Sequence, residues 1–218
     1  MARKSQITLL IYWLFFSVNS AAVNIELKDS DGQPFAGAVV EIFHPDFKLP
    51  VAPTGDQQPA EMQQINRQFK PLILIVPQNS QVLFPNSDSV KHHVYSFSKA
   101  KRFQLRLYKD QIPDPITFDK EGVVAIGCNI HDWMSGYIYV AKSRYVKQTN
   151  TNGVATFDLP EGDYTYRIWH PRFHQKDSDQ VSQLSVSSGN AASPVIFQLS
   201  KSLYPEITQD ADEFSDYD

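Results

Sequence analysis

One short stretch, Cys128-Asn129-Ile130-His131-Asp132-Trp133-Met134, brings together three side chains that can bind a soft metal ion. Cys128 is the only cysteine in the 218 residues; His131 follows three positions later, and Met134 three after that. A thiolate, an imidazole and a thioether together suit a copper ion that alternates between Cu(I) and Cu(II). Such a site also needs a second imidazole, which the upstream pair His92-His93 can supply.

Runs of β-forming residues on both sides predict that this stretch joins two strands. Val123-Val124-Ala125-Ile126 leads into Cys128, and Tyr137-Ile138-Tyr139-Val140 leads away from Met134. The polar segment 49–64, rich in Pro and Gln, is expected to be a surface connection. Similar runs predict two strands within 23–43 and others at 72–76, 81–84, 94–97, 103–107, 116–118, 154–157, 164–169, 181–186 and 195–199. So many short strands predict an all-β fold of sandwich or barrel type.

The stretches that contain the histidines and the cysteine resemble the cupredoxin family, most closely amicyanin and plastocyanin. In that family an Asn lies several residues before a His-Asn-Val/Ile segment whose His binds copper, and Asn86 with His92-His93-Val94 matches this spacing. The Cys-x2-His-x2-Met spacing matches the short loop of amicyanin. The resemblance implies a Greek-key β-sandwich over residues 62–142, with one type 1 copper ion bound by His92, Cys128, His131 and Met134.

His93 is the departure from the family pattern, because it stands where cupredoxins have an asparagine that hydrogen-bonds the cysteine-bearing loop. His93 can make that hydrogen bond through one ring nitrogen, or it can itself be the ligand in place of His92. If residues alternate faces as the chain enters the strand at Val94, only one of the two imidazoles can point at the metal.

The flanks of the copper segment resemble the two ends of one carboxypeptidase-regulatory-like, prealbumin-type β-sandwich. The first carries the segment 31–40 and the second the segment 152–164. Neither flank alone has enough strands to bury a core, so residues 23–61 and 143–200 are expected to form one sandwich around an inserted copper domain. Two consecutive sandwiches are the alternative. Each flank also contains a similar His-Pro segment, His44-Pro45-Asp46-Phe47 in the first and His170-Pro171-Arg172-Phe173-His174 in the second. These segments are expected either to pack in the sandwich or to bind a second metal.

The N-terminus has the pattern of a secretory signal. Arg3 and Lys4 precede the apolar run 7–18, which is too short for a typical membrane span, and small residues follow at 20–22. We therefore expect cleavage of residues 1–22, with an uncleaved anchor as the alternative, and a periplasmic protein without a stable membrane span. A lone thiol in an oxidising compartment must be buried, paired between chains or bound to metal. Residues 201–218 form an acidic tail that is expected to be disordered.

The charge distribution bears on partners. A net charge of −4 argues against nucleic acid, whereas residues 62–142 carry ten Lys and Arg against six Asp and Glu. The basic segment 99–109 can steer an acidic redox partner, or it is a solvated strand face. By resemblance His131 is the electron port, and partner proteins dock near His131 and Trp133; a core position is the alternative for Trp133.

The expected function is transfer of single electrons between redox partners, without enzymatic activity. No Ser/His/Asp spacing and no glycine-rich phosphate loop appears in the sequence. The copper segments also resemble exported proteins labelled as methylamine-utilisation proteins, which implies a role in amine oxidation. The alternatives are a copper-binding module for storage or delivery, and a structural or adhesive sandwich in which Cys128 is incidental.

Overall fold

The computed structural model describes residues 20–44, 58–178, 180–187 and 194–206. Residues 1–19 of the predicted signal peptide 1–22 and residues 207–218 of the predicted acidic tail lie outside these ranges. The described chain contains one four-residue helix, α1 (Gln175–Ser178), and is otherwise built of strands, so the all-β prediction is confirmed. The strands are β1 (Ser20–Lys28), β2 (Val39–Phe43), β3 (Ala60–Glu61), β4 (Gln63–Ile65), β5 (Gln68–Lys70), β6 (Ile73–Pro77), β7 (Ser80–Leu83), β8 (His92–Ser96), β9 (Phe103–Tyr108), β10 (Ile116–Phe118), β11 (Gly122–Cys128), β12 (His131–Ala141), β13 (Tyr145–Gln148), β14 (Val154–Pro160), β15 (Gly162–Trp169), β16 (Val181–Val186) and β17 (Val195–Gln198).

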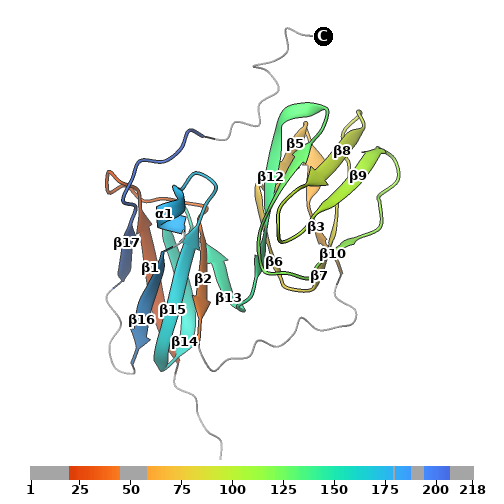
Figure 1. Cartoon of the computed structure of the whole chain (residues 1–218). Coiled ribbons are helices and arrows are strands. Elements are labelled where there is room, and N and C mark those ends of the chain that lie inside the picture. Colours follow the sequence, from red (N-terminus) through yellow and green to blue (C-terminus); the bar gives the residue numbers. More distant parts are fainter. Residues whose placement is uncertain (1–19, 45–57, 179, 188–193, 207–218) are drawn as a thin grey trace, which may run out of the picture.

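Strands β3 to β12 form what we call the central sandwich, drawn in orange-yellow to green in Figure 1. Its two larger sheets have the orders β6-β12-β11-β8-β9 and β10-β7-β3, and β4 and β5 form a separate two-stranded sheet. Because successive side chains of a strand point to opposite faces, each strand sends alternate residues into the space between the sheets. That core includes Met62, Phe69, Val82, Phe84, Val94, Phe118, Val124, Ile126, Met134 and Ile138.

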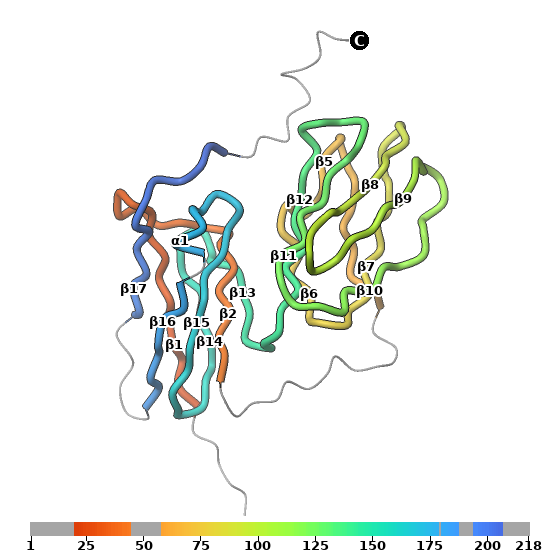
Figure 2. The backbone as a smooth tube through the Cα atoms, in the orientation of Figure 1, coloured from red at the N-terminus to blue at the C-terminus, as the bar shows by residue number. Residues whose placement is uncertain are grey.

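Strands from both ends of the described chain form a second, flanking sandwich. Strand β1 pairs with β14 and with β17 in one sheet, and the other sheet has the order β13-β2-β15-β16. Figure 1 shows the red-orange and blue strands side by side, and Figure 2 shows β13 following β12 out of the central sandwich. This pairing supports the predicted insertion, whose domain limits stay predictions.

The flanking sandwich has a core of its own, formed by the inward side chains of its two sheets. Ile25 and Leu27 of β1 are fully buried there together with Val40 and Ile42 of β2. Strands β14 and β15 add their alternate residues to the same cluster: Ala155, Phe157, Leu159, Tyr164, Tyr166 and Ile168. A strand pair that buries only one face needs such a second sheet to be stable, and here the two flanks supply one for each other.

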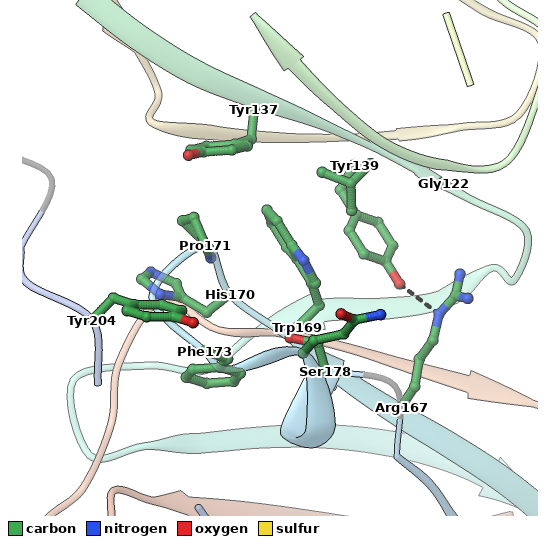
Figure 3. A pocket seen from close by; sticks show the side chains of 12 residues that line it. Gly122, Tyr137, Tyr139, Arg167, Trp169, His170, Pro171, Phe173, Ser178 and Tyr204 are labelled. Carbon is green, nitrogen blue, oxygen red and sulfur yellow. Dashed lines mark hydrogen bonds between the residues drawn. The ribbon is translucent and has the colours of Figure 1, made fainter. Parts of the chain in front are cut away.

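The two sandwiches meet through a third apolar cluster. Tyr139 and Ala141 of β12 and Ile73 of β6 pack against Val39 of β2 and Trp169 of β15. A cleft of about 530 Å³ opens beside this contact. Figure 3 shows Tyr137 and Tyr139 on one side of it and His170, Phe173 and Tyr204 on the other.

A buried carboxylate also joins the two sandwiches. Glu41 of β2 is fully buried and accepts hydrogen bonds from the Tyr139 hydroxyl at 2.7 Å and the Arg167 guanidinium at 2.8 Å. It also accepts the backbone N–H groups of Lys142 and Ser143, both at 2.7 Å, in the link that follows β12. Arg167 Nε donates to the Tyr139 oxygen at 2.9 Å, which Figure 3 marks with a dashed line. The buried carboxylate is thus paired with Arg167, and both of its oxygens accept hydrogen bonds, as burial in a low dielectric requires.

The segment 49–64, predicted to be a surface connection, contains strand residues at its C-terminal end. Residues 49–57 of the segment 49–64 lie outside the described ranges, but β3 pairs with β7, and β4 with β5. Met62 and Gln64 are both fully buried. The prediction of a surface connection is therefore wrong for residues 60–64. Their polar composition does not indicate strands, yet β3 and β4 form here and alternate residues are buried. Within the described ranges, no helix has the length and apolar character needed to cross a membrane.

Candidate metal centre

Three of the four predicted donor residues lie at strand ends, at one end of the five-stranded sheet. His92 is the first residue of β8, Cys128 the last of β11, and His131 the first of β12. Cys128 lies opposite Val94 on one side and opposite His131 on the other. Adjacent β-strands are only about 4.8 Å apart, so these three positions are close to one another by topology alone.

The side chains turn this proximity into a cluster of donor atoms. The Cys128 sulfur lies 3.5 Å from Nδ1 of His131 and 3.7 Å from Nδ1 of His92. The two imidazole rings have centroids 5.0 Å apart. One donor atom from each of these three residues lies within 4.8 Å of the other two, which makes them the only such His/Cys/Asp/Glu group among the described residues. Two imidazole nitrogens and a thiolate around one point fit a soft transition-metal ion.

A bulge in β12 shapes the turn. Gly127 lies opposite Ser135, but the next pair is Cys128 with His131, so Asp132, Trp133 and Met134 have no partner on β11. Such extra residues bend a strand and redirect its side chains. The Trp133 ring packs against His131 with centroids 5.4 Å apart. Met134 is fully buried in the core cluster that also contains Cys128.

The connection between β11 and β12 is shorter than the sequence predicts. The sequence places the strand ends at Ile126 and Tyr137, whereas β11 continues to Cys128 and β12 begins at His131. Only Asn129 and Ile130 remain as the connecting turn, which Figure 2 shows between β11 and β12. The Asn129 N–H donates to the His93 carbonyl at 3.1 Å, which ties this turn to β8. The cysteine and the loop histidine are therefore fixed by strand pairing.

His92 and His93 lie on opposite faces of β8. His92 is fully buried beside Cys128, while the His93 ring is half-buried and its Nε2 lies 2.6 Å from the Gln104 side-chain nitrogen. Strand alternation separates the two imidazoles, as the sequence pattern implies. Of the two, only His92 belongs to the donor cluster in this structure.

His92 is held from its far side by a carboxylate that the sequence patterns did not single out. Its Nε2 lies 2.8 Å from Oδ2 of Asp88, and the Asp88 side chain is itself only 10% exposed. An ionised carboxylate can only accept hydrogen bonds, so Nε2 carries a proton toward Asp88. In the neutral ring, Nδ1 then has the lone pair that faces Cys128. Asp88 lies in an irregular segment before the strand, where strand periodicity carries no information.

Asn86 organises the same segment. Its side-chain oxygen accepts the Asp88 N–H at 2.9 Å, and its amide nitrogen donates to the carbonyls of Val90 and Tyr108 at 2.9 and 3.1 Å. Asn86, which matches the family pattern in the sequence, therefore stabilises the turn that contains Asp88 and precedes His92.

The electrostatics of the cluster follow from burial and mutual contact. Burial alone would raise the pKa of the Cys128 thiol, but the contact with His92 and backbone N–H groups outweighs it and lowers that pKa below its ordinary value. Burial would lower the pKa of His92, but its interactions with Cys128 and Asp88 raise it. For His131, burial and then the charge of His92 both lower the pKa. These contacts thus shift Cys128 toward the thiolate, the form of cysteine that binds metals.

The other histidines lie in the flanking sandwich, away from this centre. The His170 ring packs edge-on against Phe35 and lies near Phe173, with centroids 4.9 and 5.5 Å apart. Burial, and then the Arg172 charge, lower the pKa of His170 to about 4. His44 packs against Tyr164, and His174 stacks on Tyr204. The described histidines of the two similar His-Pro segments therefore pack against aromatic rings. Residues 45–47 of the first segment lie outside the described ranges.

Comparison with known proteins yields structural matches only. No family model matches the chain, and no curated protein matches it. A copper-containing nitrite reductase from Thermus scotoductus SA-01 aligns over 45% of this chain and 27% of its own, with 24% identity and a TM-score of 0.37. A variant of amicyanin in its reduced Cu(I) form aligns over 46% of this chain and 99% of its own, with 17% identity and a TM-score of 0.35.

A purple cupredoxin from Nitrosopumilus maritimus aligns over 38% of this chain and 99% of its own, with 26% identity and a TM-score of 0.33. These proteins are similar to less than half of the chain, and TM-scores this low do not establish a family.

Proposed function

We propose that the protein is a type 1 copper protein that carries single electrons between redox partners. The observation that carries this proposal is the convergence of Cys128 with Nδ1 of His92 and of His131, all within 4.8 Å. Met134, buried in the same core, supplies the weak axial thioether. One copper ion bound there would supply the Cu(II)/Cu(I) redox couple, which transfers one electron.

The chain contributes a fixed geometry to this couple. His92, Cys128 and His131 belong to strands paired within one sheet, and Cys128 pairs on both of its sides. A site that keeps its shape in both oxidation states needs little rearrangement when the electron moves. The rigid strand ends, rather than a long loop, meet that need.

The route for the electron is proposed to run through His131. His92, Cys128 and Met134 are buried, whereas His131 is half-buried and its neighbours Asn129, Ile130 and Asp132 are exposed. His131 is therefore the donor residue nearest to solvent. A partner protein that docks around His131 and Trp133 would reach the metal through this imidazole.

The cellular setting is proposed from the sequence. The signal-like N-terminus and the resemblance to exported proteins support a periplasmic location and a place in an amine-oxidising chain. A thiol bound to copper is also protected in an oxidising compartment. Mass spectrometry of the protein purified from a periplasmic fraction tests the location, which an intact N-terminus in the cytoplasmic fraction would contradict.

Protein-film voltammetry of the copper-loaded protein tests the function. A carrier gives a reversible one-electron wave and retains its copper against a Cu(II) chelator when oxidised and a Cu(I) chelator when reduced. A storage or delivery protein gives up its copper in one of these states. Loss of copper to either chelator, or the lack of a reversible wave, would reject the carrier.

A further inference from the structure

The Asp88 side chain lies at the junction of three segments. Its Oδ2 lies 2.8 Å from Nε2 of His92 and accepts the backbone N–H of Arg67 at 2.9 Å, while Oδ1 accepts the N–H of Asn66 at 2.6 Å. The carboxylate is 10% exposed and His92 is not exposed at all. A carboxylate in this position is neither a surface charge nor one of the proposed copper ligands.

The turn between β4 and β5 is built to hold this carboxylate. Ile65 pairs with Gln68, so Asn66 and Arg67 form a two-residue hairpin turn, and both have positive φ values, 56° and 57°. Such a conformation is unfavourable for Arg, by about 1–2 kcal/mol. It points two successive N–H groups at Asp88, an arrangement that stabilises an anion. The hairpin therefore fixes both the place and the charge of the carboxylate.

We propose that Asp88 is a positioning residue that orients His92 for copper and biases the bound metal toward Cu(II); this inference rests on the proposed function. The hydrogen bond fixes the proton on Nε2, so that Nδ1 faces Cys128 as the donor. The negative charge makes the imidazole a more basic ligand, which stabilises the more highly charged oxidation state. The low exposure of the pair limits screening by solvent and salt.

Replacement of Asp88 by Asn tests the electronic part of the inference. Asp88→Asn removes the charge at nearly constant volume, and loss of such an outer partner lowers metal affinity about 10–100-fold. If the Cu(II) affinity falls and the Cu(I) affinity is unchanged, each tenfold loss raises the one-electron reduction potential by about 59 mV. The potential is measured by spectroelectrochemistry and both affinities by competition with chelators.

Asp132→Asn is the matched control. Asp132 is next to the ligand His131, carries the same charge and is exposed, and its substitution removes one negative charge without touching the His92 hydrogen bond. A larger rise in potential for Asp88→Asn than for Asp132→Asn supports the inference. Equal shifts, or none for Asp88→Asn, overturn it even if both proteins bind copper with a type 1 spectrum.

A measurement without copper separates this inference from the proposed function. In the copper-free wild-type protein, at a pH where His92 is neutral, long-range ¹H–¹⁵N spectra report which ring nitrogen carries the proton. Protonated Nε2 and bare Nδ1 are expected for His92, and protonated Nδ1 would overturn the inference without any variant having to fold. A wild-type protein with this tautomer but no type 1 copper site would reject the function alone.

Discussion

At the scale of single residues, the site combines groups that would each be unfavourable alone. A buried thiolate or a buried protonated imidazole pays a desolvation cost. Here the cost is offset because Cys128 contacts two imidazoles and His92 contacts Asp88. Cys128 and His92 thus stabilise each other, and Asp88 stabilises His92 from its other side, which explains how a fully buried histidine can lie beside the cysteine.

The two neighbouring histidines give a paired prediction. His92→Ala removes a proposed donor atom, so we expect Cu(II) affinity to fall by more than about 100-fold, the upper range for loss of outer partners alone. His93→Ala, on the opposite face of β8, should change the affinity little. Competition titrations with a chelator measure both variants. The ligand assignment is wrong if His93→Ala causes the larger loss.

His170 gives a prediction for pH. Its pKa of about 4 in the folded protein lies below the value of about 6.5 expected in the unfolded chain. Between these values the unfolded chain binds more protons, so stability falls as the pH drops from neutrality toward 4. At pH 5 the loss relative to pH 7 is about 2 kcal/mol, because each of the roughly 1.5 pH units below the unfolded pKa is worth about 1.36 kcal/mol.

Chemical unfolding at the two pH values, with His170→Phe for comparison, measures this loss. Phe keeps an aromatic ring beside Phe35 and Phe173 but cannot bind a proton. The variant should lack about 2 kcal/mol of the pH-dependent loss that wild type shows. Equal pH dependence in the two proteins would show that His170 does not contribute.

The sequence patterns singled out the proposed donor residues but not the carboxylate that contacts one of them. Cys128, His131 and Met134 stand out by type and spacing, and strand alternation separates His92 from His93. Asp88 has no such signal, because its contact depends on the hairpin turn at Asn66 and Arg67, about twenty residues earlier. A nonlocal contact of this kind follows from the fold and not from local periodicity.

At the scale of elements, the β11–β12 hairpin determines the geometry of the centre. Its regular pairing from Gly122–Val140 to Gly127–Ser135 is interrupted by the bulge at 132–134 and resumes with Cys128 and His131. The sequence predicted both strands, but it placed their ends too far apart. A hydrophobic pattern shows which residues favour a strand, whereas a bulge depends on the partner strand and on packing around Met134.

Gly136 tests how tightly this hairpin packs. A Cβ added there would lie 2.9 Å from Cβ of Phe69, which is buried and cannot move aside, so Gly136→Ala should destabilise the protein by about 1–3 kcal/mol. Gly127→Ala is the control, because its Cβ meets only the outer end of the half-buried Tyr95 ring at 3.2 Å. Denaturant unfolding compares the two; a Gly127 variant as unstable as the Gly136 variant would contradict the packing argument.

At the scale of the whole molecule, two sandwiches share one apolar contact and one buried carboxylate. Strands from both flanks of the chain complete the flanking sandwich, as Figure 1 shows. The sequence predicts that the two flanks form one sandwich, because neither flank alone has enough strands for a core. It did not reveal the contact between the sandwiches, since Tyr139, Trp169 and Glu41 are far apart in the chain and carry no shared motif.

Glu41 is the residue whose loss should weaken that contact. Glu41→Gln leaves the Arg167 guanidinium without its counter-charge, and breaking such a buried pair costs about 2–3 kcal/mol after allowance for the partial exposure of Arg167. Glu121→Gln, which breaks the exposed pair with Lys142, should cost less than about 1 kcal/mol. Scanning calorimetry measures both, and similar melting temperatures for the two variants would contradict the proposed role of Glu41.

The visible absorption spectrum of the Cu(II)-loaded protein tests the central claim most directly. Transfer of charge from the Cys128 thiolate to a type 1 copper ion gives an intense band, which wild type should show and Cys128→Ala should lack while remaining folded by circular dichroism. Binding of one copper ion per chain completes the expected result. A wild-type spectrum without this band, or a band that survives in Cys128→Ala, would contradict the account.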